Sequence, residues 1–358
     1  MSLQRPNIEK MHGYQPGEQL NDSDTIKLNT NENPYTPSKR VLEALSNIDG
    51  AALRRYPPPL ANDFRDQAAL LHQVRRENIV PTNGGDELLR LVFTTFADPG
   101  DTVLVMQPSY SLYPVLADIQ NCKLQEVPLE DDWSMPANFL TTAAESIARI
   151  MFLVNPHAPT GRLLDVDYLA EVAECFKGVL VIDEAYVDFV DPENEYNAIE
   201  LIQRFENVLL LRTLSKGYSL AGLRFGYGIA ATSLIEPMLL KTRDSYNTDY
   251  IAQKLAVAAL VSVSDARQNW DKIRKSRESL RIELKKLGIE TEPSQSNFLL
   301  AKMPQSINAK KLYEALKQRL ILVRYFDQPR LQDRLRITVG TPDENQQLIQ
   351  QIRKIIHD

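Results

Sequence analysis

The sequence is poor in cysteine and histidine and contains no long apolar run. Two cysteines, Cys122 and Cys175, among 358 residues cannot form a disulfide framework, and with four scattered histidines we expect no metal site. Polar residues interrupt every apolar stretch before it reaches the roughly 18 residues of a membrane-spanning helix, so we expect no membrane association. The first residues lack the apolar core of a secretory signal, which predicts a cytoplasmic protein.

An excess of basic residues is also absent. The chain carries 41 lysines and arginines against 47 acidic residues, a net charge of −6, so nothing in its charge favours a nucleic acid as partner. An apolar content of 43% excludes a disordered chain. At roughly 100–200 residues per domain, the length suits one large or two ordinary domains.

The middle of the chain alternates between strand and helix patterns. The strand candidates are short and apolar on both faces, which is typical of strands buried between two layers of helices. Helical patterns with apolar residues at a spacing of three and four separate them, as in 84–96 and 168–176. This alternation predicts an α/β fold with a mostly parallel, doubly wound sheet, whose strands are expected at 102–106, 150–154, 179–182, 208–211 and 225–230.

The two ends of the chain have a different pattern. Residues 1–30 are rich in proline, glycine and polar residues and end at a strand candidate, 26–28, so we expect an N-terminal arm. We expect a large domain over 31–245 and a small α+β domain over 246–358. The latter contains helical patterns at 251–263 and 270–287 and strand candidates at 297–301, 321–326 and 335–339.

Three successive strands of the predicted sheet end in polar side chains. Asn155 follows the first, Asp183 and Tyr186 follow the second, and Ser215 and Lys216 follow the third. Because ligands bind at the carboxyl ends of the strands in open α/β sheets, we expect these side chains to meet in one crevice.

A lysine and an aspartate in such a crevice indicate a particular kind of ligand. Desolvation favours the neutral amine of Lys216, which can then form a Schiff base with an aldehyde. A buried Asp183 needs a cationic partner, and the protonated pyridine nitrogen of pyridoxal 5′-phosphate (PLP) would serve. The amide of Asn155 and the phenol of Tyr186 could hold the 3-oxygen of that ring.

A phosphate site is expected beside this crevice. The helix that begins at Gly85 and Asp86 offers free backbone N–H groups, and Ser215 and Arg224 can complete a set of donors around an anion.

Several motifs in this order resemble the class I/II, fold-type-I, PLP-dependent aminotransferases, over essentially the whole chain. The resemblance rests on sequence segments spread from the arm to the last predicted strand. They are Leu-Asn-Thr-Asn-Glu-Asn-Pro-Tyr (28–35) with Pro-Ser (37–38), Tyr-Pro (56–57), Asn-Gly-Gly-Asp-Glu (83–87), Asn-Pro-His-Ala-Pro-Thr-Gly (155–161), Asp-Glu-Ala-Tyr (183–186), Thr-Leu-Ser-Lys (213–216), Ala-Gly-Leu-Arg (221–224) and Leu-Arg-Ile-Thr-Val-Gly (335–340).

The resemblance implies a role for each motif residue. Lys216 would hold PLP, Asp183 would pair with the pyridine nitrogen, Asn155 and Tyr186 would bind the 3-oxygen, and Tyr110 would stack on the ring. Gly85, Asp86, Ser215 and Arg224 would hold the phosphate, with Tyr56 reaching in from the second subunit of a homodimer. Arg336 would bind the substrate carboxylate, and Arg324, with Tyr14 from the arm, a substrate phosphate.

The resemblance also implies an activity. The expected substrates are small molecules, histidinol phosphate as amino donor and 2-oxoglutarate as acceptor, with imidazole-acetol phosphate and glutamate as products. Three alternatives stay open at this stage: a transaminase of aromatic amino acids, a threonine-phosphate decarboxylase of the same fold, and a PLP-binding regulator without catalysis. The short, proline-rich arm is a poor match to a DNA-binding helix-turn-helix, which counts against the last alternative.

Some of the proposed ligand residues also fit simpler roles. Arg336 alternates with apolar neighbours and suits the solvated face of a strand, while Arg324 could form a structural salt bridge. Tyr110 could belong to the core, as aromatic residues often do.

Overall fold

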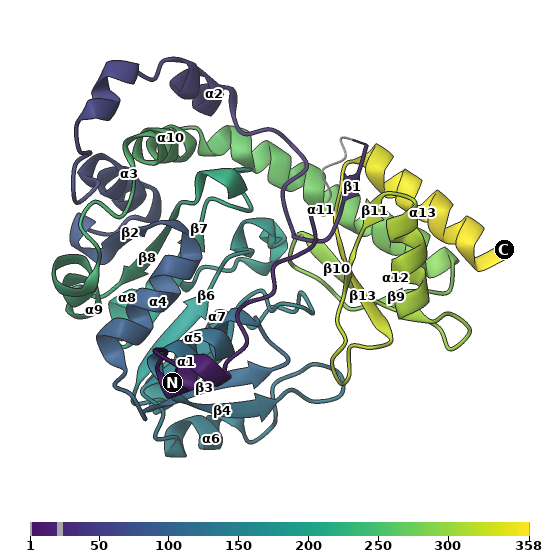
Figure 1. Ribbon diagram of the computed structural model, residues 1–358, viewed down its shortest axis with the longest axis horizontal. Helices are drawn as coiled ribbons and strands as arrows, with labels where there is room; N and C mark the ends of the chain where they lie inside the picture. Colours follow the sequence, from purple (N-terminus) through teal and green to yellow (C-terminus); the bar gives the residue numbers. More distant parts are fainter. Residues whose placement is uncertain (1, 20–23, 358) are drawn as a thin grey trace.

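The centre of the molecule is a seven-stranded sheet. The computed structural model describes residues 2–19 and 24–357, so residues 20–23 of the predicted arm lie outside the described part. The strand order is β2-β8-β7-β6-β5-β3-β4 (Figure 1). Strand β8 is antiparallel to both neighbours and the other pairs are parallel, which confirms the predicted mostly parallel sheet. The strands are β2 (Ile79–Thr82), β3 (Thr102–Gln107), β4 (Lys123–Pro128), β5 (Ile150–Val154), β6 (Val179–Asp183), β7 (Val208–Thr213) and β8 (Gly226–Ala230).

Two of these strands were missed in the sequence, and both lie at an edge of the sheet. Strand β4 is exposed or half-buried along its length and carries lysine and glutamate, so it lacks the apolar run of a central strand. Strand β2 has four residues and includes Pro81, which a central strand does not tolerate. Strand β4 therefore escapes a search for buried apolar runs because it is exposed, and β2 because its buried run is short and contains a proline.

Helices cover both faces of this sheet because successive strand residues point to opposite sides. In β5, Met151 and Leu153 join one apolar cluster and Ile150, Phe152 and Val154 join the other. Helices α3, α6, α7 and α10 bury residues in the first cluster, and α4, α5 and α9 in the second. The helices are α1 (Pro6–Lys10), α2 (Lys39–Ser46), α3 (Asn62–His72), α4 (Gly84–Phe96), α5 (Leu112–Gln120), α6 (Phe139–Glu145), α7 (Val166–Cys175), α8 (Leu201–Arg204), α9 (Thr232–Pro237), α10 (Tyr250–Val261), α11 (Val263–Lys286), α12 (Ala309–Gln318) and α13 (Pro342–His357).

A second, smaller sheet has the strand order β12-β13-β10-β9 and packs with the C-terminal helices (Figure 1). Its strands are antiparallel: β9 (Glu290–Thr291), β10 (Phe298–Lys302), β12 (Arg324–Tyr325) and β13 (Arg334–Thr338). The prediction of a single strand at 321–326 is wrong, because this segment contains two strands that belong to different sheets. Its first part, β11 (Ile321–Leu322), pairs with β1 (Ile26–Lys27) of the arm, and only β12 belongs to the small sheet.

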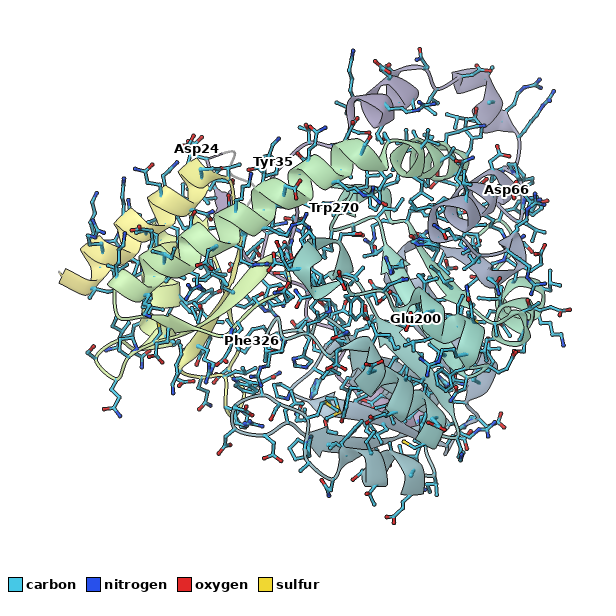
Figure 2. The ribbon with its side chains drawn as sticks, turned by 180° about the vertical axis from the view of Figure 1, so that it is seen from behind. Asp24, Tyr35, Asp66, Glu200, Trp270 and Phe326 are labelled. Carbon is cyan, nitrogen blue, oxygen red and sulfur yellow. The ribbon has the colours of Figure 1, made fainter. Side chains whose placement is uncertain are left out.

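The long helix α11 joins the two sheets (Figure 2). Its first half places Trp270 and Ile273 in an apolar cluster of the large sheet, and its second half places Leu280 and Leu284 in that of the small sheet. Because α10 also packs with the large sheet, we propose that the boundary between the two domains lies inside α11 rather than at residue 245. Among the described residues, none of the helices has the length and apolar character needed to cross a membrane.

The N-terminal arm contacts both parts of the molecule. Near its start, Arg5 Nη2 and Asn7 Nδ2 donate to the carbonyl oxygens of Ile119 and Asp118 at the end of α5, at 2.9 and 2.7 Å. Further along, Glu18 pairs with Lys317 of α12. The residues between these anchors are therefore held across the junction of the two sheets.

One glycine of β8 allows the close approach of β8 to the start of α4. A Cβ atom built on Gly226 would lie 2.8 Å from the carbonyl carbon of Gly84 and 2.8 Å from the nitrogen of Gly85. We expect Gly226→Ala to lower the free energy of unfolding by about 1–3 kcal/mol, because the backbone of α4 must move away. Urea unfolding of this variant beside Gly222→Ala checks this, since a Cβ on Gly222 meets nothing within 4 Å. Equal midpoints for the two variants would contradict the expectation.

Candidate active site

One cavity of about 400 Å³ lies where the large sheet, the small sheet and the arm meet. The carboxyl ends of β5, β6 and β7 form its floor, as the parallel topology requires. Most of the side chains predicted to act together line it: Tyr14, Gly85, Asp86, Tyr110, Asp183, Tyr186, Ser215, Lys216, Arg224, Arg324 and Arg336.

Lys216 follows β7 and reaches into this cavity. Its Nζ donates a hydrogen bond to the carbonyl oxygen of Thr30 at 2.8 Å. Burial, with the positive charges of Arg336 and Arg224, lowers the pKa of Lys216 to about 8. Roughly a tenth of the amine is then neutral at pH 7, enough for it to act as a nucleophile or as a base.

Asp183 ends β6 and is 4% exposed. Its Oδ2 accepts a hydrogen bond from the hydroxyl of Tyr113 at 2.8 Å, and its Oδ1 accepts one from the backbone N–H of Ala185 at 3.1 Å. Burial raises the pKa of Asp183 to about 6 despite these donors. In the described part of the chain, no lysine, arginine or histidine forms an ion pair with it, so a ligand with a positive charge fits here.

The N-terminus of α4 and Arg224 form an anion site in the same cavity. Helix α4 begins at Gly84, whose φ of 77° is one that side chains rarely adopt, and a Cβ there would lie 2.7 Å from Arg224 Nη2. The Arg224 guanidinium donates to Ser215 Oγ at 3.4 Å and to Asp86 Oδ2 at 3.3 Å. These long bonds leave the guanidinium able to turn toward an anion that binds at the free N–H groups of the helix.

Two arginines of the small sheet form the opposite wall. Arg324 and Arg336 are cross-strand partners in β12 and β13. Arg336 Nη2 donates to the carbonyl oxygen of Asn29 at 3.0 Å, while its Nε is buried without a partner among the described residues. An orphaned guanidinium donor beside a second arginine fits an anionic group of a substrate.

Aromatic side chains line the space between these walls. The Tyr110 hydroxyl donates to Asp86 Oδ1 at 3.3 Å, and the Tyr14 ring meets the Tyr110 ring edge to face at 6.0 Å. The Tyr186 hydroxyl accepts a hydrogen bond from Asn31 Nδ2 at 3.0 Å. Tyr14 thus brings the arm to the cavity, and its expected contact with a substrate phosphate stays a prediction.

Two predicted residues do not line the cavity. The Asn155 side chain is fully buried and pairs with the main chain of Leu164, through Nδ2 at 3.0 Å and Oδ1 at 2.7 Å. Tyr56 is 81% exposed and stacks on Tyr246 with ring centroids 4.5 Å apart. The roles expected for Asn155 and Tyr56 stay predictions, and that of Tyr56 requires a second subunit.

Sequence reasoning missed several residues that complete this arrangement. Tyr113 holds Asp183, and Asn31 holds Tyr186. Tyr113 lies three residues after Tyr110, a spacing that indicates a shared face, whereas Asn31 lies inside a segment that carried the resemblance. Phe326 and Gln328 gave no signal because they lie on a loop that only the folded chain brings to the cavity.

Comparison with known proteins identifies the same architecture and confirms the resemblance. The sequence profile of the family described as aminotransferase class I and II matches residues 23–352. The chain is 43% identical over 353 residues to histidinol-phosphate aminotransferase 1 of Trichormus variabilis, with 98% of each chain covered. It is 42% identical over 352 residues to the histidinol-phosphate aminotransferase of Geotalea uraniireducens, covering 98% of this chain and 99% of that one.

A solved structure is similar over the whole chain. The histidinol-phosphate aminotransferase of Sinorhizobium meliloti, crystallised with pyridoxal-5′-phosphate, superposes with a TM-score of 0.90 and 23% identity, covering 100% of this chain and 98% of that one. At this identity the likeness concerns the fold, and it confirms the predicted fold type.

The buried carboxylate of Asp183 should make the free energy of unfolding depend on pH. Burial raises the pKa of Asp183 in the folded protein to about 6, above the ordinary value of 3.8, so the folded state binds more protons between these pH values. Stability contributed by the protonated carboxyl is therefore lost as pH rises from about 4 to about 6. We expect Asp183→Asn to raise the free energy of unfolding by on the order of 2 kcal/mol at pH 8 and by little at pH 4. Urea denaturation at both pH values measures this, and a loss of stability at pH 8 would contradict it.

Proposed function

The chain belongs to the class I and II aminotransferases, and from this premise we propose that it transfers the amino group of L-histidinol phosphate to 2-oxoglutarate, giving imidazole-acetol phosphate and glutamate in histidine biosynthesis. Relatives that carry the histidinol-phosphate aminotransferase name match almost the full length of this chain. The observation that carries the proposal is the cavity itself, whose lining brings Lys216 and Asp183 together with Arg324 and Arg336, cross-strand partners in the small sheet.

The residues of the cavity fit PLP at three separate points. Asp183 supplies the negative charge that a pyridinium nitrogen needs, and Lys216 supplies an amine for the aldehyde. The start of α4, with Ser215 and Arg224, supplies donors for the phosphate. When bound, PLP supplies an electron sink that stabilises negative charge on the carbon bearing the amino group.

Lys216 is the residue proposed to move the proton. Its Nζ can take a proton from the substrate carbon that carries the amino group, because its pKa of about 8 keeps part of the amine neutral near pH 7. The carbonyl oxygen of Thr30, now 2.8 Å away, gives Nζ a fixed position when the amine is free. The conjugate ammonium can then return the proton elsewhere on the same face of the substrate.

Asp183 is proposed to act as a fixed negative charge. The bonds from Tyr113 and Ala185 hold both carboxylate oxygens, so the group cannot turn away from its ligand. A cation opposite the carboxylate favours its ionised form, which offsets the effect of burial on its pKa.

The two arginines of the small sheet are proposed to bind both substrates in turn. Histidinol phosphate carries a phosphate and 2-oxoglutarate carries carboxylates, and planar guanidinium groups bind either kind of anion through paired donors. The free Nε of Arg336 is one such donor. Tyr14 of the arm lies beside them in the cavity lining and can add a hydroxyl.

We also propose a homodimer, located in the cytoplasm. The stacked rings of Tyr56 and Tyr246 are exposed, and three leucines on α2 and the turn after it are at least 45% exposed, namely Leu42, Leu45 and Leu53. A second copy that covers this surface would bury these side chains and could bring Tyr56 to the neighbouring cavity.

Replacement of Lys216 tests the activity. We expect Lys216→Ala to lower the rate of glutamate formation from histidinol phosphate and 2-oxoglutarate by at least about 10³-fold, because both nucleophile and base are lost. Borohydride treatment of the PLP-loaded protein should leave a pyridoxyl group on the peptide 213–218 of the parent and not of the variant. Lys286→Ala, which removes an exposed lysine outside the cavity lining, is the matched control and should keep activity and label.

The same assay separates the alternatives that the sequence left open. Single-turnover reactions of the PLP form should convert histidinol phosphate faster than phenylalanine or threonine phosphate, without release of carbon dioxide. Faster conversion of phenylalanine, or carbon dioxide from threonine phosphate, would overturn the proposed substrate.

A mixing experiment tests the role of Tyr56. Lys216→Ala and Tyr56→Ala each damage a different part of a shared site, so a mixed dimer would contain one intact site. We expect equal amounts, unfolded and refolded together, to regain about a quarter of parental activity, since half of randomly formed dimers are mixed and each has one working site of two. Activity no higher than the average of the separately refolded variants would show that Tyr56 does not act across subunits.

A further inference from the structure

A loop from the small sheet forms part of the substrate side of the cavity. Between β12 and β13 the chain places Phe326, Gln328 and Leu331 in the cavity lining. Figure 2 shows Phe326 between the small sheet and the large sheet. Arg324 and Arg336 both lie over its ring, each with the guanidinium carbon 5.5 Å from the ring centroid. The position of this loop therefore affects the two arginines proposed to bind substrate.

We propose that Trp133 and Arg330 are positioning residues that hold the 326–333 loop against the large sheet and thereby set the affinity for the amino donor. This inference rests on the proposed function. Trp133 lies on the segment after β4, so it belongs to the large-sheet side of the cavity. It contacts Glu292, Arg330 and Arg334, and we call these four residues the Trp133 clasp.

The indole ring is held on its faces and at its edge. The guanidinium carbons of Arg330 and Arg334 lie 4.5 and 5.0 Å from the ring centroid. Glu292 Oε1 accepts hydrogen bonds from Trp133 Nε1 at 3.2 Å and from Arg334 Nη1 at 2.9 Å. Trp133 is only 4% exposed and Arg334 is also buried, so that cation contact is largely shielded from water, which strengthens it, whereas Arg330 stays partly exposed.

Arg330 joins the loop to the main chain of the large-sheet segment. Its Nη1 donates to the carbonyl oxygen of Leu129 at 2.7 Å, and its Nη2 donates to that of Glu130 at 2.5 Å. Both Arg330 and Trp133 adopt positive φ angles, 68° and 67°, which non-glycine residues rarely adopt. Residues in such conformations persist where surrounding contacts over-determine them, and here the contacts are those of the clasp.

The clasp is coupled to the substrate side by two short paths. Arg334 and Arg336 are two residues apart in β13, so their side chains leave the strand on the same side. Leu331 lies in the same apolar cluster as Trp133, although its loop comes from the small sheet. A loop released from Trp133 would thus loosen the wall formed by Phe326 and Arg336, while Lys216, Asp183 and the anion site stay on the large sheet.

The test uses Arg330→Gln in the full-length, PLP-loaded protein. The Arg330 side chain is 31% exposed, so its replacement creates no buried cavity. We expect KM for histidinol phosphate to rise by about tenfold, with kcat changed by less than about threefold and PLP affinity by less than about twofold. Amide hydrogen exchange within 326–333 should quicken by about tenfold or more, with rates around Lys216 unchanged.

Arg204→Gln is the matched control. Arg204 also lies over an aromatic ring, that of Phe205 at 5.1 Å, and it is absent from the cavity lining. This variant should leave KM and the exchange of 326–333 as in the parent. Arg330→Lys keeps a cation near Trp133 but loses the paired donors, so its KM should lie between those of the parent and Arg330→Gln.

The outcomes separate this inference from the proposed function. If the parent converts histidinol phosphate and Arg330→Gln has the same KM within twofold, the positioning role is wrong while the proposed function stands. If kcat and PLP affinity fall to the same extent as KM rises, Arg330 has a role in folding only. Should Arg330→Gln fail to fold, the same criteria apply to Arg330→Lys and to Trp133→Phe, which keeps the ring face and loses the bond to Glu292.

Discussion

The site depends on a carboxylate buried without a cation. Asp183 lies at the end of a strand whose neighbours on both sides are buried, and the only donors on its oxygens among the described residues are neutral, Tyr113 and the N–H of Ala185. Burial penalises its charge, and two neutral hydrogen bonds offset only part of that penalty. The unpaired charge of Asp183 therefore lowers stability, and a cationic group that binds beside it would remove this penalty, which contributes to the affinity for that group.

Burial also disfavours the charged form of Lys216, but for a lysine this lowers the pKa rather than raising it. Burial and two nearby guanidiniums disfavour its ammonium form, while Glu32 and Asp86 favour it, so its pKa settles near the pH at which an enzyme works. The carboxylate and the amine follow adjacent parallel strands, β6 and β7, which fixes their separation through the sheet rather than through a flexible loop. The same sheet thus positions both an anchored carboxylate and a partly neutral amine.

The residues at these strand ends could be predicted from the sequence because each lies at the end of its strand or within three residues of it. Asp183 ends β6, while Ser215 and Lys216 come two and three residues after β7, and chain order then determines the edge at which they meet. Prediction failed where position depends on tertiary contacts. The 321–326 segment divides between two sheets because β1 of the arm pairs with its first part, and no local pattern reports that partner. Tyr113 and Trp133 are ordinary apolar residues in the sequence, and only folding brings them to Asp183 and to Arg330.

The two sheets contribute different residues to the cavity. The large sheet carries Asp183 and Lys216, the residues proposed to act in the reaction, and the strands that position them, β6 and β7, have neighbours on both sides in the sheet. The small sheet carries Arg324 and Arg336, the two arginines that we propose bind the substrates. If these arginines bind two different anions in turn, as proposed, their side chains need some freedom to move, yet too much freedom would lower the affinity for both anions. Helix α11 and the Trp133 clasp connect the sheets at different places, one through apolar packing and one through cations on an indole ring. Because the second connection involves the loop beside the arginines, it can limit their movement without constraining Lys216.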